Sequence, residues 1–476
     1  MSLPAPLPLS FILRPASALA LAVLLACGAD TALESAGKPP LFMAAAHADD
    51  GDGGDDGGGD GGDDGGGSAG GGAAGGGGGS GSGGSGGAAG AGSGPGGGGD
   101  IDFEPPEDTP AVNAELFIVD ELLAVNPSAA ALRRANALGI TVLARVRAAS
   151  LPLNVVRLRL PRGLDAKTAR QLLARSDPGV FDLHHLYALA QNSAASACSG
   201  PGCSPLQLIG WPDDARNCGR GQTIGIVDTA VATAHPALAG ATVRTHSIVD
   251  KDRTAAPSDH GTAVAALLVG RAESGFPGML PRARLLAAAP FYTLESGTVT
   301  AHTAGLVGSL DWLVAQGAKV VGMSLAGPHN LVLDAAIARA AKKGVVVVAA
   351  AGNGGRRAPP AYPAAFDQVL AVTAISPERR VYWRANQGDY VDYALPGVDL
   401  WTADSASADS AAGKRRSGTS FAVPFMVGMA SQGLAQRTVN RRQLQEGKLA
   451  SLSDLGSPGR DPVFGWGKPR FIAACR

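Results

Sequence analysis

Aromatic residues, net charge and long apolar runs are all scarce in this sequence. Aromatic residues make up 5% of the 476 residues, and the formal net charge is −1. A chain without an excess of basic residues lacks the surface that binds polyanions, so we expect no nucleic-acid partner. No uninterrupted apolar run reaches the about 18 residues that suggest a membrane-spanning helix. The length still allows two or three domains.

Cysteine is also scarce, and its distribution suits an exported protein. Apart from Cys27 near the N-terminus, the chain holds Cys198, Cys203, Cys218 and Cys475, which form no metal-type C-x-x-C pair. An even set of cysteines is compatible with disulfides in an oxidising compartment. We favour the pairs Cys198–Cys203 and Cys218–Cys475, with four free thiols as the alternative.

Residues 1–48 are expected to be an export signal. Arg14 precedes a mainly apolar stretch from Ala16 to Ala26, which has the length of a signal-peptide core and is too short to span a membrane. Cleavage after Ala26 would follow a lipobox-like Leu-Leu-Ala-Cys segment, so that a lipid on Cys27 anchors the chain in the cell envelope. Cleavage after Ala48, at an Ala-x-Ala site, would instead give a secreted protein. Both sites remain open.

Residues 49–113 are expected to be a flexible linker. The segment 49–100 consists almost entirely of Gly, Asp, Ser and Ala and holds close to half of the 68 glycines. Such a composition buries too little apolar surface to offset the entropy of ordering the chain. A calcium-binding nonapeptide repeat is the alternative, but it requires a regularly placed apolar residue that this segment lacks.

Residues 114–190 are predicted to form a small α+β unit. Apolar spacing predicts strands over 114–125, 140–150, 154–161 and 181–190, with helices over 128–138 and 166–176. In the third strand Val156, Leu158 and Leu160 alternate with arginines, and Asp165 is placed to cap the second helix. This order of elements is that of the ferredoxin-like fold. We interpret His184 and His185 as a solvated strand end.

The region from Gln222 onward is predicted to form an α/β domain. Strands are predicted over 223–227, 284–291, 319–325, 345–351 and 368–375, and helices over 302–316, 331–343 and 420–436. Continuous rather than alternating apolar runs indicate strands buried on both faces, hence a mainly parallel sheet covered by helices on both faces. Ligands bind at the strand ends of such sheets.

Three short segments at these strand ends and helix starts carry reactive side chains. They read IGIVDTAV around Asp228, DHGTAVAALLVG around His260 and SGTSFAVPFMVG around Ser420. A serine hydroxyl is a poor nucleophile at neutral pH until an imidazole takes its proton, and a carboxylate can orient that imidazole. A fourth segment, VVVVAAAGNGG, ends in Asn353, whose amide could stabilise an oxyanion. Together they predict a nucleophilic serine hydrolase.

These segments resemble those of subtilisin-like serine proteases (subtilases), in which the order Asp, His, Ser is found. The resemblance covers residues 205–470 and places a catalytic domain at 197–476. It implies that Asp228, His260 and Ser420 are catalytic, with Asn353 and the Ser420 amide as oxyanion donors. It also implies a substrate pocket whose walls are two short segments: Ser324, Leu325, Ala326 and Gly327, and Ala350, Ala351 and Gly352.

The unit at 114–190 resembles, in size and position, the propeptides that precede such domains and act as chaperones and inhibitors; a stand-alone binding module is the alternative. A small-residue stretch follows it, so we expect self-cleavage between Ala188 and Cys198. The predicted protein is therefore an exported serine endopeptidase made as a self-processing zymogen, acting on protein or peptide substrates. A catalytically silent, surface-tethered binding protein on the same scaffold is the alternative.

The sequence departs from the subtilase pattern at several positions that do not carry the reacting atoms. Ala230, Ala263 and Ala266 replace residues that are usually Gly, His and Gly, and Phe421 and Phe425 replace Met and His. None removes a reacting atom, so activity is still expected. Calcium ligands cannot be carried over residue by residue, so no metal or cofactor is assigned. The basic run at 414–416 could favour acidic substrates, but we interpret it as a solvated loop.

Overall fold

The computed structural model describes residues 116–190, 204–406, 413–449, 451–471 and 475. We call residues 116–190 the small unit and residues 204–475 the large unit. The export signal, the Gly/Asp-rich linker and the predicted Cys198–Cys203 pair lie outside the described residues. In the part of the chain that is described, no helix has the length and apolar character needed to cross a membrane.

The small unit is a four-stranded antiparallel sheet with two helices. Its strand order is β2-β3-β1-β4, and its elements follow the chain in the predicted order. They are β1 (Phe117–Val125), α1 (Ala129–Ala137), β2 (Thr141–Ala148), β3 (Leu153–Arg159), α2 (Ala166–Ala174) and β4 (Phe181–Leu189).

One face of the small sheet packs against its own helices. Val156, Leu158 and Leu160 all lie in this core, as the alternation predicts, and they are joined there by Leu173 of α2. Asp165 caps α2 by accepting a hydrogen bond at Oδ1 from the Thr168 backbone amide at 3.0 Å, which satisfies one of the free donors of the first turn. The small unit therefore has a core of its own.

The other face of the small sheet belongs to the core of the large unit. Leu123, Leu151 and Val155 are fully buried in a cluster that also contains residues from two large-unit helices, α5 (Thr303–Ala315) and α6 (Leu331–Lys342). Polar contacts accompany this packing. The Leu151 amide donates to Asp311 Oδ1 at 2.9 Å, and the Leu331 amide at the start of α6 donates to Asp182 Oδ2 at 2.8 Å.

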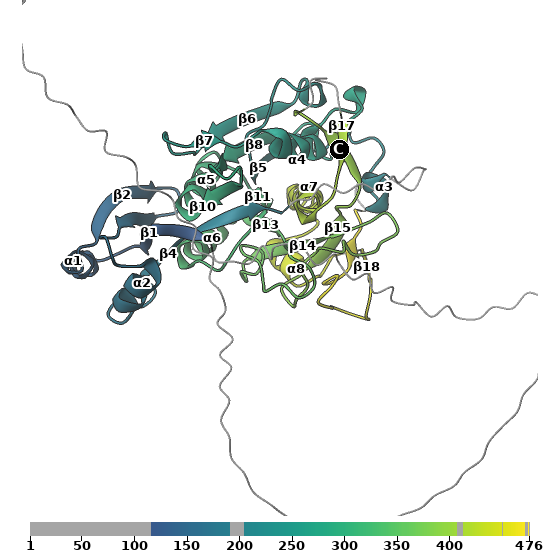
Figure 1. Ribbon diagram of the computed structural model, residues 1–476. Coiled ribbons are helices and arrows are strands. Elements are labelled where there is room, and N and C mark those ends of the chain that lie inside the picture. Colours follow the sequence, from purple (N-terminus) through teal and green to yellow (C-terminus); the bar gives the residue numbers. More distant parts are fainter. Residues whose placement is uncertain (1–115, 191–203, 407–412, 450, 472–474, 476) are drawn as a thin grey trace, which may run out of the picture. The chain divides into compact units, whose positions relative to one another are not determined.

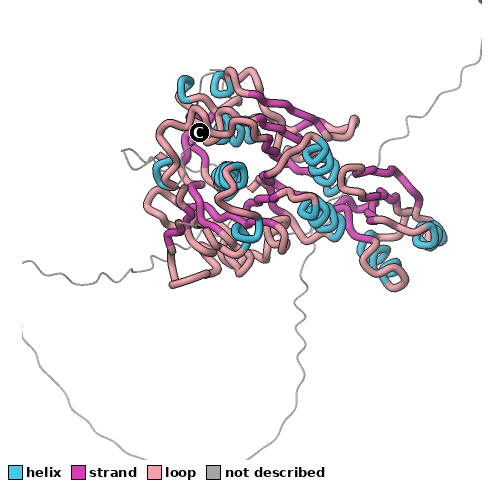
Figure 2. The backbone as a smooth tube through the Cα atoms, turned by 180° about the vertical axis from the view of Figure 1, so that it is seen from behind, coloured by secondary structure: helices cyan, strands magenta, loops and turns pink. Residues whose placement is uncertain are grey.

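The large unit is built on a seven-stranded parallel sheet. Figure 2 draws the strands of the chain in magenta and the helices around them in cyan. The order of the parallel sheet is β15-β14-β13-β11-β5-β8-β6, and every neighbouring pair is parallel. The strands are β5 (Thr223–Val227), β6 (Thr242–Ser247), β8 (Arg284–Ala289), β11 (Val320–Met323), β13 (Val346–Ala350), β14 (Val369–Ile375) and β15 (Tyr393–Pro396). The parallel sheet predicted from continuous apolar runs is confirmed. The two edge strands, β6 and β15, were not predicted; β6 is largely exposed and carries no continuous apolar run.

Helices cover both faces of this sheet (Figure 1). On one face the helices α4 (Asp259–Val269) and α7 (Val423–Ala435) share a core with alternate strand residues; on the other face α5 and α6 do so. Shorter helical segments are α3 (Pro205–Leu208), η2 (Pro236–Leu238), η3 (Ala272–Ser274), η4 (Thr419–Phe421) and α8 (Arg441–Gln445). The remaining short strands are β7 (Thr254–Ala255), β9 (Tyr292–Thr293), β10 (Val299–His302), β12 (Leu325–Ala326), β16 (Leu400–Ala403), β17 (Gly413–Arg416), β18 (Leu452–Ser453) and β19 (Lys468–Pro469).

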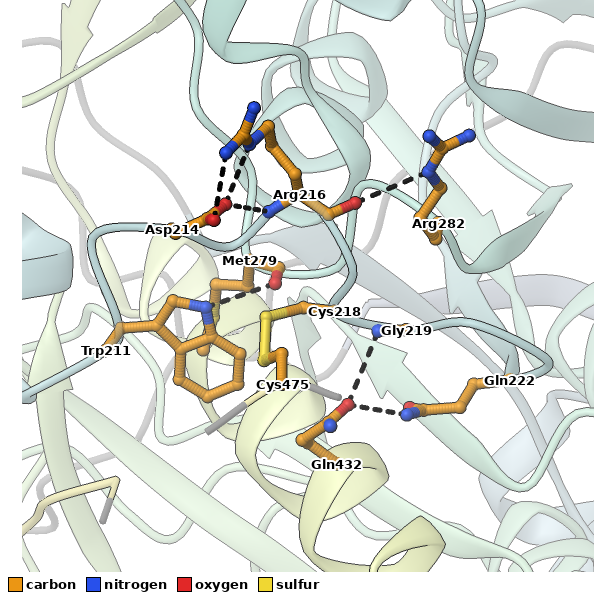
Figure 3. The surroundings of a disulfide bond; sticks show 10 residues. All are labelled: Trp211, Asp214, Arg216, Cys218, Gly219, Gln222, Met279, Arg282, Gln432 and Cys475. Atoms are coloured by element: carbon orange, nitrogen blue, oxygen red, sulfur yellow. Dashed lines mark hydrogen bonds and ion pairs between the residues drawn. A yellow bond between two sulfur atoms is a disulfide. The ribbon is translucent and has the colours of Figure 1, made fainter. Parts of the chain in front are cut away.

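A disulfide joins the two ends of the large unit (Figure 3). Cys218 and Cys475 are bonded, as predicted. Next to the bond, Gln432 Oε1 of α7 accepts hydrogen bonds from the Gly219 amide at 3.3 Å and from Gln222 Nε2 at 2.6 Å. The disulfide and this side chain together hold the start of the large unit against α7.

Candidate active site

Asp228 and His260 form a buried pair at the carboxyl end of the parallel sheet. Asp228 directly follows β5, and His260 is in the first turn of α4. Asp228 Oδ1 lies 2.6 Å from His260 Nδ1, and both side chains are fully buried. Because a carboxylate oxygen accepts hydrogen bonds, Nδ1 donates to Asp228 and Nε2 is the ring nitrogen left for another partner. His260 Nε2 has no hydrogen-bond partner among the described residues.

A glycine allows this approach of α4 to the strand end. A Cβ at Gly261 would lie 2.4 Å from the Thr229 carbonyl oxygen, which is closer than real Cβ contacts permit. The Gly261 amide instead donates to Thr229 Oγ1 at 2.8 Å. The His-Gly-Thr segment therefore fixes the first turn of α4 against the loop that follows Asp228.

Ser420 lies in η4, immediately before α7, and its polar atoms contact the end of the small unit. The Ser420 amide donates to the Ala190 carbonyl oxygen at 3.1 Å. The Ser420 hydroxyl donates to the same oxygen at 2.5 Å and to the Ser324 carbonyl at 3.1 Å. The hydroxyl thus bonds to backbone carbonyls rather than to His260 Nε2. The three predicted segments meet at one place, where the carbonyl of Ala190 is also held.

Asn353 follows β13 and lies beside the Ser420 segment. Its Oδ1 accepts hydrogen bonds from the Thr419 amide at 3.1 Å and from Thr419 Oγ1 at 2.9 Å. These contacts orient the side chain, and its Nδ2 is left buried without a partner among the described residues. An unpaired buried donor is costly and needs an explanation. A ligand that develops negative charge here would supply the missing acceptor.

The last residues of β4 in the small unit lie between two strands of the large unit. It pairs antiparallel with β10 through Ala188 and Tyr187, and antiparallel with β12 through Leu189 and Ala188. The Ala190 amide then donates to the Ser324 carbonyl at 3.3 Å. An extended segment therefore enters the site with its backbone paired on both sides. The role of β10 was not predicted, because the strand is short and its importance depends on β4, which is distant in sequence.

The predicted pocket residues take different places around this strand. Leu325 and Ala326 pair with β4 as part of β12, and the Ser324 carbonyl accepts from Ala190. A cavity of about 360 Å³ lies alongside, and Ala326, Gly327 and Gly352 contribute to its lining together with Asn353. Ala350 and Ala351 are fully buried at the end of β13 and are not among the described residues that line it.

Tyr187 of β4 fills a site that depends on Gly327. A Cβ at Gly327 would lie 2.4 Å from the Tyr187 ring, so no other residue fits there without displacement. The Tyr187 hydroxyl donates to the Pro328 carbonyl at 3.0 Å, and Thr300 Oγ1 donates to the Tyr187 carbonyl at 2.9 Å. Burial raises the pKa of Tyr187 well above its ordinary value.

The prediction that His184 and His185 form a solvated strand end is wrong, since both side chains are buried. His184 Nδ1 lies 2.9 Å from Glu121 Oε2, and its Nε2 accepts from the Ala304 amide of the large unit at 3.5 Å. His185 Nδ1 lies 2.9 Å from Asn330 Nδ2, also of the large unit. The sequence could not indicate this, because the large unit supplies half of the surroundings.

Charged side chains surround His184 where the two units meet. Arg157 of the small unit bonds to Glu121 at 3.1 Å and to Asp250 of the large unit at 2.9 Å. Burial opposes ionisation of Glu121, but the hydrogen bonds from His184 and Arg157 and the positive charge of Arg157 outweigh it and keep the pKa of Glu121 below its ordinary value. Burial lowers the pKa of His184 to about 3 despite the nearby carboxylate. Neutral His184 therefore donates from Nδ1 to ionised Glu121.

The basic run before Ser420 is not the solvated loop that was predicted. Its residues form β17, in which Lys414 is exposed but Arg416 is buried. Arg415 forms an ion pair with Asp399 at 3.2 Å, and Arg416 forms ion pairs with Asp259 and Asp404, each at 3.2 Å. These guanidinium groups are paired with acids of the large unit itself.

Within the described residues, no group of three or more His, Cys, Asp and Glu side chains could hold a metal ion. The polar groups gathered at this site are side chains and backbone amides. Their arrangement suits acyl transfer: a hydroxyl, an imidazole oriented by a carboxylate, a backbone amide that donates to the Ala190 carbonyl, and the unpaired amide of Asn353 nearby in the chain fold.

Comparison with known proteins gives consistent results. The subtilase family model matches residues 219–467. The large unit is similar to thermitase of Thermoactinomyces vulgaris, with 38% identity over 247 residues, which is 50% of this chain and 85% of thermitase. It is also similar to the thermophilic serine proteinase of Bacillus sp. strain AK1, with 32% identity over 250 residues, covering 50% of this chain and 58% of that protein.

Among solved structures, fervidolysin from Fervidobacterium pennivorans has a similar fold. It is described as a keratinolytic enzyme related to subtilisin. The alignment has a TM-score of 0.60 at 19% identity and covers 74% of this chain and 60% of that chain. At this identity the likeness concerns the fold alone.

Proposed function

We propose that this chain, which belongs to the subtilase family and is a serine endopeptidase, is a zymogen that cleaves its own peptide bond between Ala190 and Gln191. The observation that carries the proposal is the position of Ala190. Its carbonyl oxygen accepts from the Ser420 amide at 3.1 Å and from the Ser420 hydroxyl at 2.5 Å. This bond lies within the interval between Ala188 and Cys198 that the sequence suggests.

The chemistry proceeds by acyl transfer. Ser420 Oγ attacks the carbonyl carbon of Ala190 while its proton passes to His260 Nε2. To do so the hydroxyl turns from its present carbonyl acceptors towards the free Nε2. The bond to Gln191 then breaks as His260 returns the proton to the leaving nitrogen. A water molecule hydrolyses the ester and leaves Ala190 with a carboxylate.

Asp228 and Asn353 stabilise the charges that develop during this reaction. Asp228, at 2.6 Å from His260 Nδ1, holds the ring in the tautomer that accepts the proton and stabilises the imidazolium. The Ser420 amide and Asn353 Nδ2 donate to the oxyanion of the tetrahedral intermediate. Asn353 is suited to this because Thr419 orients it and its Nδ2 is otherwise unpaired. Such a donor contributes mainly in the transition state.

Protein substrates bind as β4 does, in an extended form between β10 and β12. Backbone pairing on both sides is independent of side-chain identity, so the cleft accepts many sequences. Selectivity between substrate sequences comes from the two sites of the cleft that hold the Ala190 and Tyr187 side chains. A small residue before the cleaved bond and a tyrosine three positions earlier match the segment that the cleft holds.

The small unit remains as an inhibitor after cleavage. Its hold does not depend on the Ala190–Gln191 bond, because β4, the apolar face with Leu123 and Val155, and the Arg157–Asp250 ion pair all persist. Activity therefore appears only when the small unit leaves or is digested. The same contacts with α5 and α6 support a role for the small unit in folding the large one.

The enzyme acts outside the cytoplasm. The export signal of residues 1–48 and the Cys218–Cys475 disulfide support this, because disulfides persist in oxidising compartments. With cleavage after Ala48 the protein is secreted. With cleavage after Ala26 and a lipid on Cys27, the anchor stays with the small unit and the processed protease diffuses away.

Replacing Ser420 by Ala tests the proposal directly. We expect Ser420→Ala to abolish hydrolysis of an unfolded protein such as casein and to leave the full-length precursor uncut in a host lacking other proteases. Wild-type protein should yield a chain that begins at Gln191, measured by N-terminal sequencing. A matched control is Ser431→Ala on α7. The Ser431 hydroxyl donates to Gln222 Oε1 at 2.5 Å and has no hydrogen bond to Ala190 in the described structure. This variant should process normally.

A serine-directed fluorophosphonate probe separates the protease from the silent binding protein. The processed protein should be labelled at Ser420 and at no other serine, because only an activated hydroxyl reacts. Absence of labelling in a folded, processed protein would support the binding protein instead. A precursor with Ser420→Ala that still matures to the same size would show that another protease makes the cut.

A further inference from the structure

We propose that Arg416 is a positioning residue that fixes His260 relative to Ser420. This inference rests on the proposed function, because it concerns the same reaction. Arg416 is the last residue of β17 and lies four positions before Ser420 in the chain. Its side chain joins the segment that carries the nucleophile to the helix that carries the imidazole.

The side chain of Arg416 bridges two carboxylates. Its Nη1 bonds to Asp259 Oδ2 at 3.2 Å, and its Nη2 bonds to Asp404 Oδ1 at 3.2 Å. The Arg416 side chain is 8% exposed. A guanidinium presents its donors in a rigid plane, so two simultaneous partners restrict both its position and theirs. Asp259 directly precedes His260 at the start of α4.

The start of α4 needs such a contact. Ser258 occupies the N-cap position but makes no side-chain capping bond to the helix. His260 is anchored by its Nδ1 to Asp228, while its Nε2 has no partner among the described residues. The distance from Nε2 to Ser420 therefore depends on where the first turn of α4 lies. Gly261 holds this turn against Thr229 on the Asp228 side, and the ion pair of Asp259 with Arg416 adds a second hold from the Ser420 side.

Other contacts of the β16–β17 hairpin act in the same direction. Thr402 Oγ1 of β16 donates to the Ala263 carbonyl of α4 at 2.7 Å, and Ser258 Oγ lies 3.2 Å from Ser405 Oγ. At its other end the hairpin leads into the nucleophile segment, where the Gly418 amide donates to the Gly397 carbonyl at 2.8 Å. The hairpin thus contacts α4 on both sides of His260 and continues directly towards Ser420. Arg416 is the charged link between them.

Two substitutions remove this link with different side effects. Arg416→Met removes the guanidinium and leaves Asp404 without it. Asp259→Asn keeps the size of the side chain and the pair of Arg416 with Asp404, and weakens only the link to α4. Because misplacing a reacting group by about 1 Å can cost roughly 100-fold in rate, we expect each variant to lower kcat by about 10-fold to 100-fold. KM should change by less than about twofold, since β10 and β12 bind the substrate.

The experiment uses the full chain, with kcat and KM for a peptide substrate normalised to the processed chain measured by mass spectrometry. Arg415→Met is the matched control: it removes the same group at the adjacent position of β17, where the ion pair is with Asp399. We expect Arg415→Met to keep the wild-type kcat. Arg416→Lys should recover only part of the rate relative to Arg416→Met. The ammonium keeps the positive charge, but it cannot hold both carboxylates in one plane. The double variant with Asp259→Asn and Arg416→Met should be no slower than Arg416→Met alone.

Several outcomes would overturn the inference while leaving the proposed function intact. One is a wild-type kcat in Asp259→Asn with Ser420→Ala still inactive. Another is an equal loss in Arg415→Met and Arg416→Met, which would indicate a general effect on the hairpin. A change confined to KM, or losses that multiply in the double variant, would assign Arg416 a different role. If Ser420→Ala retains activity, the proposed function itself fails.

Discussion

The small unit and the large unit treat their buried polar groups differently. Where the small unit meets the large one, its buried Glu121, His184 and Asp182 all have hydrogen-bond or ion-pair partners. At its sheet edge the large unit leaves His260 Nε2 and Asn353 Nδ2 buried without partners among the described residues. Unpaired groups cost stability, and paired ones specify how two surfaces fit. On the proposed function, the unpaired groups of the large unit await a substrate, whereas the paired groups of the small unit fix how it fits against the large unit.

The unpaired donor of Asn353 provides the largest test of this contrast. We expect Asn353→Ala to lower kcat by about 100-fold to 1,000-fold, because the lost hydrogen bond forms only in the transition state. KM should change little, and steady-state kinetics on processed enzyme will measure both. Asn440→Ala is the control, since Asn440 caps α8 and should affect stability without changing kcat. A change confined to KM would refute the oxyanion role of Asn353.

The buried cluster of His184, Glu121 and Arg157 predicts that binding of the small unit to the large unit depends on pH. In the complex the pKa of His184 is about 3, below the ordinary value of 6.5 that water restores after release. Binding is therefore strongest above pH 6.5 and weakens as the pH falls towards 3. Protonation would also set His184 Nε2 as a donor against the Ala304 amide. From pH 7 to pH 5 we expect the inhibition constant of the small unit to rise roughly 25-fold.

Inhibition of processed enzyme by added small unit, measured at each pH, checks this effect. Around His184 the charged groups are Glu121, Arg157 and Asp250, and the ring of His302 is a further titratable group whose centroid lies 4.8 Å away. Glu121 stays ionised across this pH range because its pKa lies below its ordinary value. His184→Asn should flatten the pH dependence, while His246→Asn, at an exposed position of β6, should preserve it. An unchanged slope in His184→Asn would assign the effect elsewhere.

Removing an exposed ion pair of the large unit should have the smallest effect, in this case on the melting temperature. Arg216 pairs with Asp214 at 2.9 Å, and both side chains are largely exposed (Figure 3). Solvent screens such pairs, so we expect Arg216→Ala to leave the melting temperature of the Ser420→Ala precursor unchanged. Arg157→Met, which removes a partly buried link between the units, should lower it in the same calorimetric assay. Equal changes in melting temperature for Arg216→Ala and Arg157→Met would show that an ion pair buried between the units stabilises the protein no more than an exposed one.

Much of the fold could be predicted because its signals are local. Continuous Val and Ala runs such as 345–351 indicate strands buried on both faces, and the alternation of Val156, Leu158 and Leu160 indicates a strand with one buried face. The meeting of the segments around Asp228, His260 and Ser420 follows from a strand end and two helix starts at one edge of a parallel sheet. The pairing of Cys218 with Cys475 was also predicted correctly.

The errors arose where distant segments determine the surroundings. His184 and His185 have the composition of an exposed strand end, but the large unit covers them. The residues 414–416 have the composition of a solvated loop, but Asp259 and Asp404 neutralise Arg416 from other elements. The short strand β10 has no pattern of its own and gains its role only by pairing with β4. Local sequence does not contain this information.

The disulfide between Cys218 and Cys475 has a topological consequence. It closes a covalent ring across a sequence separation of 257 residues, which includes Asp228, His260, Asn353 and Ser420. A single backbone cut anywhere inside that ring opens it but leaves one covalent molecule. An enzyme surrounded by copies of itself is exposed to such nicks, and two are needed before any fragment of the ring can separate. The bond thus makes the loss of a piece depend on a second event.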